Sequence, residues 1–357
     1  MARLTRSDPA SPGWSLGRRG RGFELFDARG RKLTGDASYE RVRALVIPPA
    51  WSDVWICPSE RGHIQATGLD AAGRRQYLYH PDWTASRSRR KFTRMGEFAA
   101  ELAALRELVE HDLGDGNGLQ RSAVLAGLTR LLDIGFFRVG SERYAAENRT
   151  FGLTTLLREH ARVRRDGTIV FDYTAKHGRR RVQRASDPEV AELVARLKRR
   201  RADPHPRLFA SHDDDLWSAV RAADLNAYLK DATGADITAK DFRTWNGTVL
   251  AAALLSQVEP PTTKTGRTRA AADVLREVAD SLGNTLAVTR SSYVDPRVID
   301  RWARGETIGV AAGDVPADPE TWTPGERREV ELAVVDLLGL GKAAGKAAAR
   351  APGNARS

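Results

Sequence analysis

The spacing of apolar residues changes once along this chain, and the change divides it into two parts with different secondary structure. In residues 22–80 apolar positions alternate with others, as where Gln65 separates Ile64 from Ala66. A period of two is typical of β-strands, and the Asp- and Gly-containing segment 69–73 has the composition of a hairpin loop. We therefore expect this part to fold as a small antiparallel sheet.

Helical spacing replaces the alternation further along. Apolar side chains recur every three or four residues at Phe98, Leu102, Leu105 and Val109, and again at Val124, Leu128 and Leu131. Such spacing gives a helix one apolar face that must be buried. A mainly α-helical second domain is expected to begin near residue 90.

A basic segment, Arg87-Ser88-Arg89-Arg90-Lys91, lies where the two patterns meet. Arg89, Arg90 and Lys91 are candidates for contacts with a phosphate backbone. A solvated linker without such a role is an equally good interpretation of the same residues.

One β interruption is expected inside the helical part. Strand-like runs at Val163, 168–175 and 179–184 are separated by the turn sequences Asp-Gly at 166–167 and His-Gly at 177–178. Two tight turns between three short runs predict a three-stranded antiparallel meander.

Two further helices carry a start signal, because Asp187-Pro188 and Asp295-Pro296 each place a capping aspartate before a proline in the first helical position. The expected fold class is α+β, with a β-rich domain at residues 1–90 and a mainly helical domain with the meander at 91–340. Residues 341–357 contain lysine and arginine but no acid among alanine and glycine, and a disordered basic tail is expected there.

The net charge of the chain favours an anionic binding partner but does not identify it. Lysine and arginine total 57 against 46 acidic residues, a net charge of +11, which suits a phosphate-binding surface. The single cysteine, Cys57, rules out an internal disulfide framework. No apolar signal core or stretch of about 20 apolar residues occurs. We expect a cytoplasmic, nucleoid-associated protein.

Several familiar catalytic motifs are absent, including a glycine-rich loop ending in Gly-Lys-Ser/Thr, a His-Glu-x-x-His helix and a Gly-x-Ser-x-Gly elbow. The run 212–215, His-Asp-Asp-Asp, could suggest a divalent metal site. Consecutive side chains point in different directions, however, and Asp215-Leu216-Trp217 has the pattern of a helix start. We therefore expect a solvated helix N-terminus here and no metal site.

Four polar residues stand in unusual settings. Arg138 interrupts an apolar run after a helix, Lys176 lies at the tip of the meander, Arg243 is flanked by aromatic residues near a helix start, and Asn284 follows a glycine at a helix end. A partly buried guanidinium needs an anionic partner. Taken singly, ordinary roles suffice: Arg138 could pair with a nearby glutamate, Glu142 or Glu147, and Asn284 could be a helix cap.

Taken in order, the segments between about Tyr39 and Trp302 resemble the type IB DNA topoisomerases of the short bacterial and poxvirus kind. The matching text comprises Ile47-Pro48-Pro49-Ala50-Trp51, Gly-His-Ile-Gln-Ala-Thr-Gly at 62–68, Gly-Arg-Arg-Gln-Tyr-Leu-Tyr-His at 73–80, Phe137-Arg138-Val139-Gly140 followed by Tyr144, the segment 171–176, Asp241-Phe242-Arg243-Thr244-Trp245, Leu282-Gly283-Asn284-Thr285 and Ser291-Ser292-Tyr293. The nine-residue interval from Asn284 to Tyr293 matches the family's interval between a hydrogen-bond donor and the nucleophile. Poxvirus members carry histidine where this chain has Asn284, and a neutral amide can still donate to a phosphate oxygen.

The resemblance implies an enzyme that relaxes supercoiled duplex DNA. Tyr293 would attack a phosphodiester to form a 3′-phosphotyrosyl bond, without ATP, metal or any other cofactor. Arg138, Arg243 and Asn284 would stabilise charge on the nonbridging oxygens, and Lys176 would protonate the leaving 5′-oxygen. Considered alone, Tyr293 would be a half-buried packing residue near a helix boundary.

The resemblance also suggests DNA contacts at Gln76, Tyr77, Tyr79 and Tyr144, although tyrosines that alternate on a strand could equally pave a sheet face. The two domains would act as a monomeric clamp around double-stranded DNA. A tyrosine recombinase shares this chemistry but usually begins with a helical DNA-binding domain. A non-catalytic basic DNA-binding protein is a second alternative, for which the five catalytic matches would be accidental.

Overall fold

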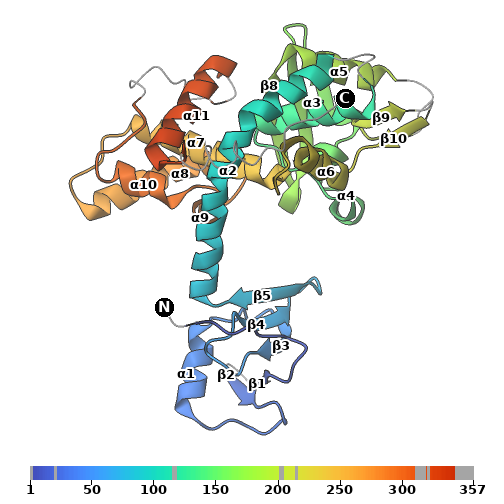
Figure 1. The fold of residues 1–357 in the computed structure, drawn as a ribbon. Helices are drawn as coiled ribbons and strands as arrows, with labels where there is room; N and C mark the ends of the chain where they lie inside the picture. Colours follow the sequence, from blue (N-terminus) through green and yellow to red (C-terminus); the bar gives the residue numbers. More distant parts are fainter. Residues whose placement is uncertain are drawn as a thin grey trace. The chain divides into compact units, whose positions relative to one another are not determined.

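The structure is a computed structural model that describes residues 3–19, 22–114, 119–200, 205–213, 216–309, 319 and 322–341, apart from the side chains at positions 18, 19 and 89. The chain divides into two compact units, residues 1–91 and 92–357. The division falls inside one long helix, α2 (Pro81–Gly114) (Figure 1). Of the predicted tail, residues 341–357, all but residue 341 lie outside the described residues.

The first unit contains the predicted antiparallel sheet. Its strands are β1 (Trp14–Arg19), β2 (Gly22–Phe26), β3 (Ser52–Ile56), β4 (Ile64–Leu69) and β5 (Arg75–Tyr79), in the order β2-β1-β3-β4-β5 (Figure 1). The expected hairpin joins β4 to β5: Asp70 accepts hydrogen bonds from the N–H groups of Ala72 and Arg74, and Gly73 adopts a φ of 70°. Only glycine adopts that conformation without steric cost.

A helix, α1 (Asp36–Ala44), also lies in this unit, where only strands had been expected. Its Val42 is buried with Leu25, Ile56 and Ala66 of the sheet. The predicted β-rich domain is confirmed, and α1, which was not predicted, arises because residues 36–44 lack alternation and form a helix that covers the apolar side of the sheet.

The second unit is mainly helical, as predicted. After the second part of α2 its helices are α3 (Arg121–Ile134), α4 (Glu142–Asn148), α5 (Pro188–Arg199), α6 (Ala222–Thr233), α7 (Ala239–Ser256), α8 (Lys264–Leu282), α9 (Leu286–Ser292), α10 (Pro296–Trp302) and α11 (Pro324–Leu338). The apolar stripes predicted on α2 and α3 are buried in one core with α7, where the Phe98 and Phe242 rings meet edge to face at 4.9 Å. The helical periodicity therefore identified the core-facing residues correctly.

The predicted meander is present as β6 (Ala161–Val163), β7 (Thr168–Ala175) and β8 (Arg179–Ser186), paired in the order β6-β7-β8. Both predicted helix starts are also confirmed. Asp187 accepts a hydrogen bond from the N–H of Val190 at the start of α5, and Asp295 accepts one from the N–H of Arg297 at the start of α10.

The predicted helix start at residues 215–217 is wrong. Strands β9 (Ala210–Asp213) and β10 (Leu216–Ala219) form an antiparallel hairpin there, and residues 214 and 215 lie outside the described set. The Trp217 ring packs against the ring of His212 and the guanidinium of Arg200. These contacts favour a strand over the helix that the local pattern of Asp, Leu and Trp suggested.

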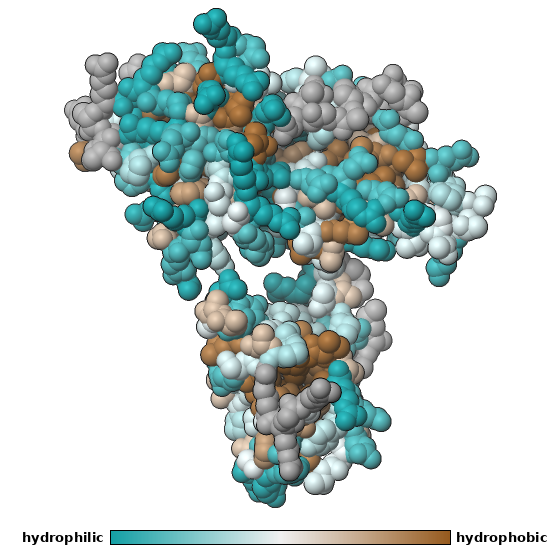
Figure 2. Space-filling view, turned by 180° about the vertical axis from the view of Figure 1, so that it is seen from behind, coloured by the Kyte–Doolittle hydropathy of each residue, from teal (hydrophilic) through white to brown (hydrophobic). Residues whose placement is uncertain are grey.

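The basic segment 87–91 is helical, because it lies within α2. Arg90 is exposed and Lys91 is partly buried, whereas the Arg89 side chain is not among those described. In the space-filling view hydrophilic residues dominate the visible surface, with small hydrophobic patches between them (Figure 2). No helix in the described part of the chain is long and apolar enough to cross a membrane.

Candidate active site

Three of the candidate catalytic residues of the second unit, Arg138, Arg243 and Asn284, lie at the C-terminal end of α8. The last carbonyl groups of any helix lack partners within the helix and carry partial negative charge, so they attract cations. Here three guanidiniums occupy them: Arg181 binds the carbonyls of Asp280 and Ser281, Arg243 binds that of Leu282, and Arg138 binds that of Gly283.

Arg138 follows α3 in the sequence and reaches across to this helix end. Its Nη2 donates to the Gly283 carbonyl at 2.7 Å and to Asn284 Oδ1 at 2.5 Å. The alternative partners are engaged elsewhere, since Glu142 pairs with Arg207 and Glu147 with Arg143. Burial lowers the pKa of Arg138, although the nearby tyrosines Tyr293 and Tyr173 act in the opposite direction.

Arg243 projects from the first turns of α7 and is only 4% exposed. It donates to the carbonyls of Phe136 and Leu282, and its Cζ lies 5.2 Å from the centre of the Tyr293 ring. Burial, together with the charge of Arg138, lowers the pKa of Arg243 to about 10. The guanidinium therefore remains cationic at neutral pH.

Tyr293 is the residue that ends α9, and its N–H donates to the Thr289 carbonyl at 2.9 Å. Gly247 of α7 lies close against the backbone of Tyr293. A Cβ on Gly247 would be 2.8 Å from the Tyr293 backbone carbonyl oxygen. Arg243 and Gly247 are one turn apart on α7 and so share a face. The same face of α7 thus contacts both the ring and the backbone of Tyr293.

Asn284 comes directly after the glycine that ends α8, as the sequence suggested. Its Oδ1 accepts the bond from Arg138, and its Nδ2 is buried without a hydrogen-bond partner. A guanidinium can only donate, so this bond fixes the orientation of the amide. An unused N–H donor is left beside the two arginines.

Lys176 lies at the tip of the β7–β8 hairpin, as predicted, where His177 adopts a left-handed φ of 67°. It is exposed, and within the described part of the chain no hydrogen bond or ion pair joins it to Arg138, Arg243, Asn284 or Tyr293. Among the predicted catalytic residues, Arg138 therefore bonds to Asn284, Arg243 packs on the Tyr293 ring, and both arginines bind the end of α8, whereas Lys176 takes part in none of these contacts.

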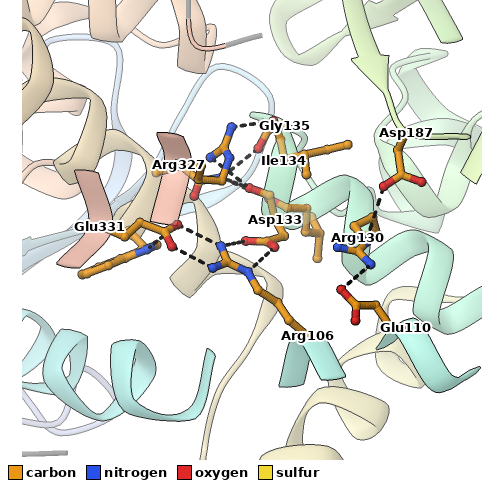
Figure 3. Close-up of polar contacts among 12 residues, drawn as sticks. Arg106, Glu110, Arg130, Asp133, Ile134, Gly135, Asp187, Arg327 and Glu331 are labelled. Atoms are coloured by element: carbon orange, nitrogen blue, oxygen red, sulfur yellow. Dashed lines mark hydrogen bonds and ion pairs between the residues drawn. The ribbon is translucent and has the colours of Figure 1, made fainter. Parts of the chain in front are cut away.

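The loop that carries Arg138 is held from two sides. Asn246 Nδ2 of α7 donates to the carbonyls of Leu132, Asp133 and Gly135 at 2.9 to 3.1 Å. From α11, Arg327 donates to the carbonyls of Asp133 and Ile134 (Figure 3). These bonds satisfy the carbonyls at the end of α3 and so restrict the path of the chain into Arg138.

A buried ion network lies beside this loop (Figure 3). Arg106 of α2 binds Asp133 at 2.7 and 2.8 Å and Glu331 of α11 at 2.8 and 2.9 Å, and Glu331 also accepts from Trp245 Nε1. Burial alone would lower the pKa of Arg106, but the two carboxylates outweigh it and raise that pKa. The network links α2, α3, α7 and α11.

The predicted DNA contacts fall in both units. On β5, Tyr77 and Tyr79 are 44% and 46% exposed and their rings stack at 6.0 Å, whereas Gln76 points to the other face and donates to Asp70. Tyr144 on α4 is 41% exposed. Exposed aromatic rings are available to a ligand, but Gln76 is already engaged within its own hairpin.

The sequence interpretation missed Arg181. A signal was present, because Arg181, Gln183 and Ala185 alternate along β8 and the last two are buried. The same face therefore carries Arg181 toward the interior, where it meets α8. Among the described residues, no group of three or more His, Cys, Asp or Glu side chains is arranged to hold a metal ion.

Comparison with known proteins identifies the family. A family model described as eukaryotic DNA topoisomerase I, catalytic core, matches residues 80–303, and one described as bacterial DNA topoisomerase IB, N-terminal domain, matches residues 22–70. The chain is 28% identical to a protein of Acanthamoeba polyphaga mimivirus named DNA topoisomerase 1B, over 76% of this chain and 81% of that protein. Since the catalytic-core model alone covers more than half of the 357 residues, the chain belongs to the type IB DNA topoisomerases, isomerases that act on DNA.

Proposed function

We propose that this protein relaxes supercoiled duplex DNA by cutting and resealing one strand through Tyr293. The phenol oxygen attacks a backbone phosphorus, forms a 3′-phosphotyrosyl ester and expels a 5′-hydroxyl end. The free end swivels and its hydroxyl then attacks the ester, which restores the strand. The ester conserves the energy of the broken bond, so the cycle needs no ATP, and we propose that protein side chains supply the electrostatic stabilisation without a metal.

The observation that carries this proposal is the arrangement of Arg138, Arg243 and Asn284 around Tyr293. Displacement at phosphorus concentrates negative charge on the nonbridging oxygens, and preorganised donors stabilise it. The Arg243 guanidinium is buried, that of Arg138 is partly buried, and the Asn284 amide keeps an unused donor. We infer that all three bind those oxygens.

Lys176 is our candidate for the general acid that protonates the leaving 5′-oxygen. Its exposed position at a hairpin tip leaves the ammonium accessible to a bound strand. We infer further that the protein acts as a monomer in the cytoplasm, in association with the nucleoid. We also infer that the side chains named above as DNA contacts bind the duplex, including Arg89, Arg90 and Lys91.

The direct test mixes purified protein with supercoiled plasmid in EDTA without nucleotide. We expect complete relaxation and, after denaturation, protein attached to the 3′ side of the nick. Plasmid that stays supercoiled in the presence of folded, DNA-bound protein would refute the proposal. Recombinant products at paired sites would favour a tyrosine recombinase, and binding without any covalent adduct would favour a non-catalytic protein.

Arg243→Lys should slow strand cleavage by about 10²- to 10³-fold, the usual loss when one preorganised donor to a developing oxyanion is removed. Lysine keeps the charge but lacks the planar fork that spans two acceptors. The measurement is single-turnover cleavage at saturating DNA. A rate within a factor of two of wild type would contradict the assigned role.

Tyr77→Ala and Tyr79→Ala should each weaken duplex binding roughly three- to tenfold, because one hydrogen bond to the ligand contributes about 1 kcal/mol. Both rings are about half exposed, so the fold should tolerate their loss. Val46→Ala, which removes another exposed apolar group of the same unit, is the matched control. Equal affinity for all four proteins in a titration at fixed salt would remove these tyrosines from the interface.

A further inference from the structure

Of the three guanidiniums that bind the end of α8 among the described residues, Arg181 has no role in the proposed chemistry. It lies on β8, directly opposite Tyr173 of β7 and only three residues beyond the turn formed by Lys176, His177 and Gly178. Its side chain leaves the sheet and donates to the carbonyls of Asp280, at 2.8 Å, and Ser281. The hairpin that carries Lys176 is thereby bonded to the helix end that carries Asn284.

Arg181 also packs closely against the end of α8, in addition to its hydrogen bonds. A Cβ on Gly283 would lie 2.8 Å from Arg181 Nη1, and Gly283 also has a left-handed φ of 61°. Any larger residue at position 283 would press on the guanidinium. Helix α8 thus ends in a residue that permits Arg181 to approach its last carbonyls.

The remainder of the hairpin shows why such an anchor matters. One face of the hairpin is buried at Tyr173, Ala175, Gln183 and Ala185, and Tyr173 donates to Gln183 at 2.6 Å. Residues 176–180 are all exposed. Near the exposed tip, Arg181 lies opposite buried Tyr173 and bonds the hairpin to the helix end where the arginines meet.

We propose that Arg181 is a positioning residue that places Lys176 for proton transfer by fixing the hairpin to α8. This rests on the proposed function. As the bond between phosphorus and the 5′-oxygen breaks, a proton moves from the Lys176 ammonium to that oxygen, and the transfer requires the two atoms to be within hydrogen-bonding distance. Without Arg181 the tip samples more positions and the transfer slows.

The test compares two DNA strands that differ in one atom. In the first the 5′-bridging atom is oxygen, and in the second it is sulfur, which leaves without protonation because thiols ionise near pH 8.5, far more readily than alcohols. Arg181→Ala should slow single-turnover cleavage of the oxygen strand by about 10- to 100-fold, part of the usual contribution of a general acid. Cleavage of the sulfur strand should stay close to the wild-type rate.

Four further variants test whether Arg181 acts through Lys176. The double variant Arg181→Ala, Lys176→Ala should cleave the oxygen strand no more slowly than Lys176→Ala alone, since both changes disable one step. Arg180→Ala is the matched control, because this neighbour lies on the opposite face and pairs with exposed Asp172. Arg181→Lys keeps a donor for one carbonyl, so its rate of oxygen-strand cleavage should lie between those of wild type and Arg181→Ala. This variant also tests the proposal if Arg181→Ala does not fold.

The outcomes distinguish failure of the proposed function from failure of the positioning role of Arg181. If wild-type protein forms no adduct on either strand, the proposed function fails and this inference falls with it. If wild type cleaves normally but Arg181→Ala and Arg181→Lys leave the oxygen strand unaffected, or slow both strands equally, only the role of Arg181 is overturned. Additive losses in the double variant would likewise show that Arg181 does not act through Lys176.

Discussion

Tyr293→Phe is expected to abolish relaxation and the covalent adduct, with a loss of at least about 10⁴-fold, since removal of a nucleophile eliminates the step on which the others depend. The change deletes one oxygen and keeps the ring that lies 5.2 Å from Arg243. Packing against the core should be maintained, so stability and duplex affinity should stay near wild type.

Two assays decide this prediction. Plasmid relaxation in EDTA measures the turnover, and denaturing gels with end-labelled DNA measure the adduct. A thermal melt and a binding titration serve as controls for folding and DNA affinity. Residual relaxation above the level of a mock preparation would assign the nucleophile to another residue and would undermine the proposed mechanism at its first step.

Glu331→Ala is expected to destabilise the second unit by about 3 to 5 kcal/mol, the usual cost of removing one partner from a buried ion pair. Glu331 is 5% exposed and accepts bonds from Arg106 and Trp245. Its loss leaves the guanidinium with Asp133 alone and the indole N–H without that acceptor. Urea unfolding followed by circular dichroism measures the change.

Glu110→Ala is the matched control for this prediction, because Glu110 also pairs with an arginine, Arg130, but at 3.5 Å and with 63% of its side chain exposed (Figure 3). Exposed pairs contribute about 0 to 1 kcal/mol. Similar losses in the two variants would mean that the buried network contributes no more than a surface pair. Helix α11 lies beyond the region matched by the catalytic-core model, so a large loss would also show that this segment contributes to the stability of the second unit.

Local patterns were sufficient for most of the secondary structure. Alternation predicted the strands around Ile64, and helical spacing predicted the buried stripe that begins at Phe98. The aspartates at 187 and 295 marked two helix starts. Each of these signals acts between residues a few positions apart, which is why a single sequence contains them.

Where a local signal competed with a distant contact, prediction failed. The residue types at 215–217 are typical of a helix start. Trp217 nevertheless packs against Arg200, and strands β9 and β10 form a hairpin. Likewise, glutamates lay close to Arg138 in sequence, but the guanidinium bonds to a helix end 145 residues away. Proximity in sequence suggested the wrong partner because folding brings a better acceptor within reach.

The sequence by itself determined the α+β class, the family and the identities of the candidate residues, because these depend on periodicity and on the order of motifs. Only the tertiary structure decided that three guanidiniums, Arg181 among them, bind the end of α8. It also decided that Arg106 joins Asp133 of α3 to Glu331 of α11. These arrangements arise because buried carbonyls and carboxylates must find cationic donors, and the nearest donors in space come from distant parts of the chain.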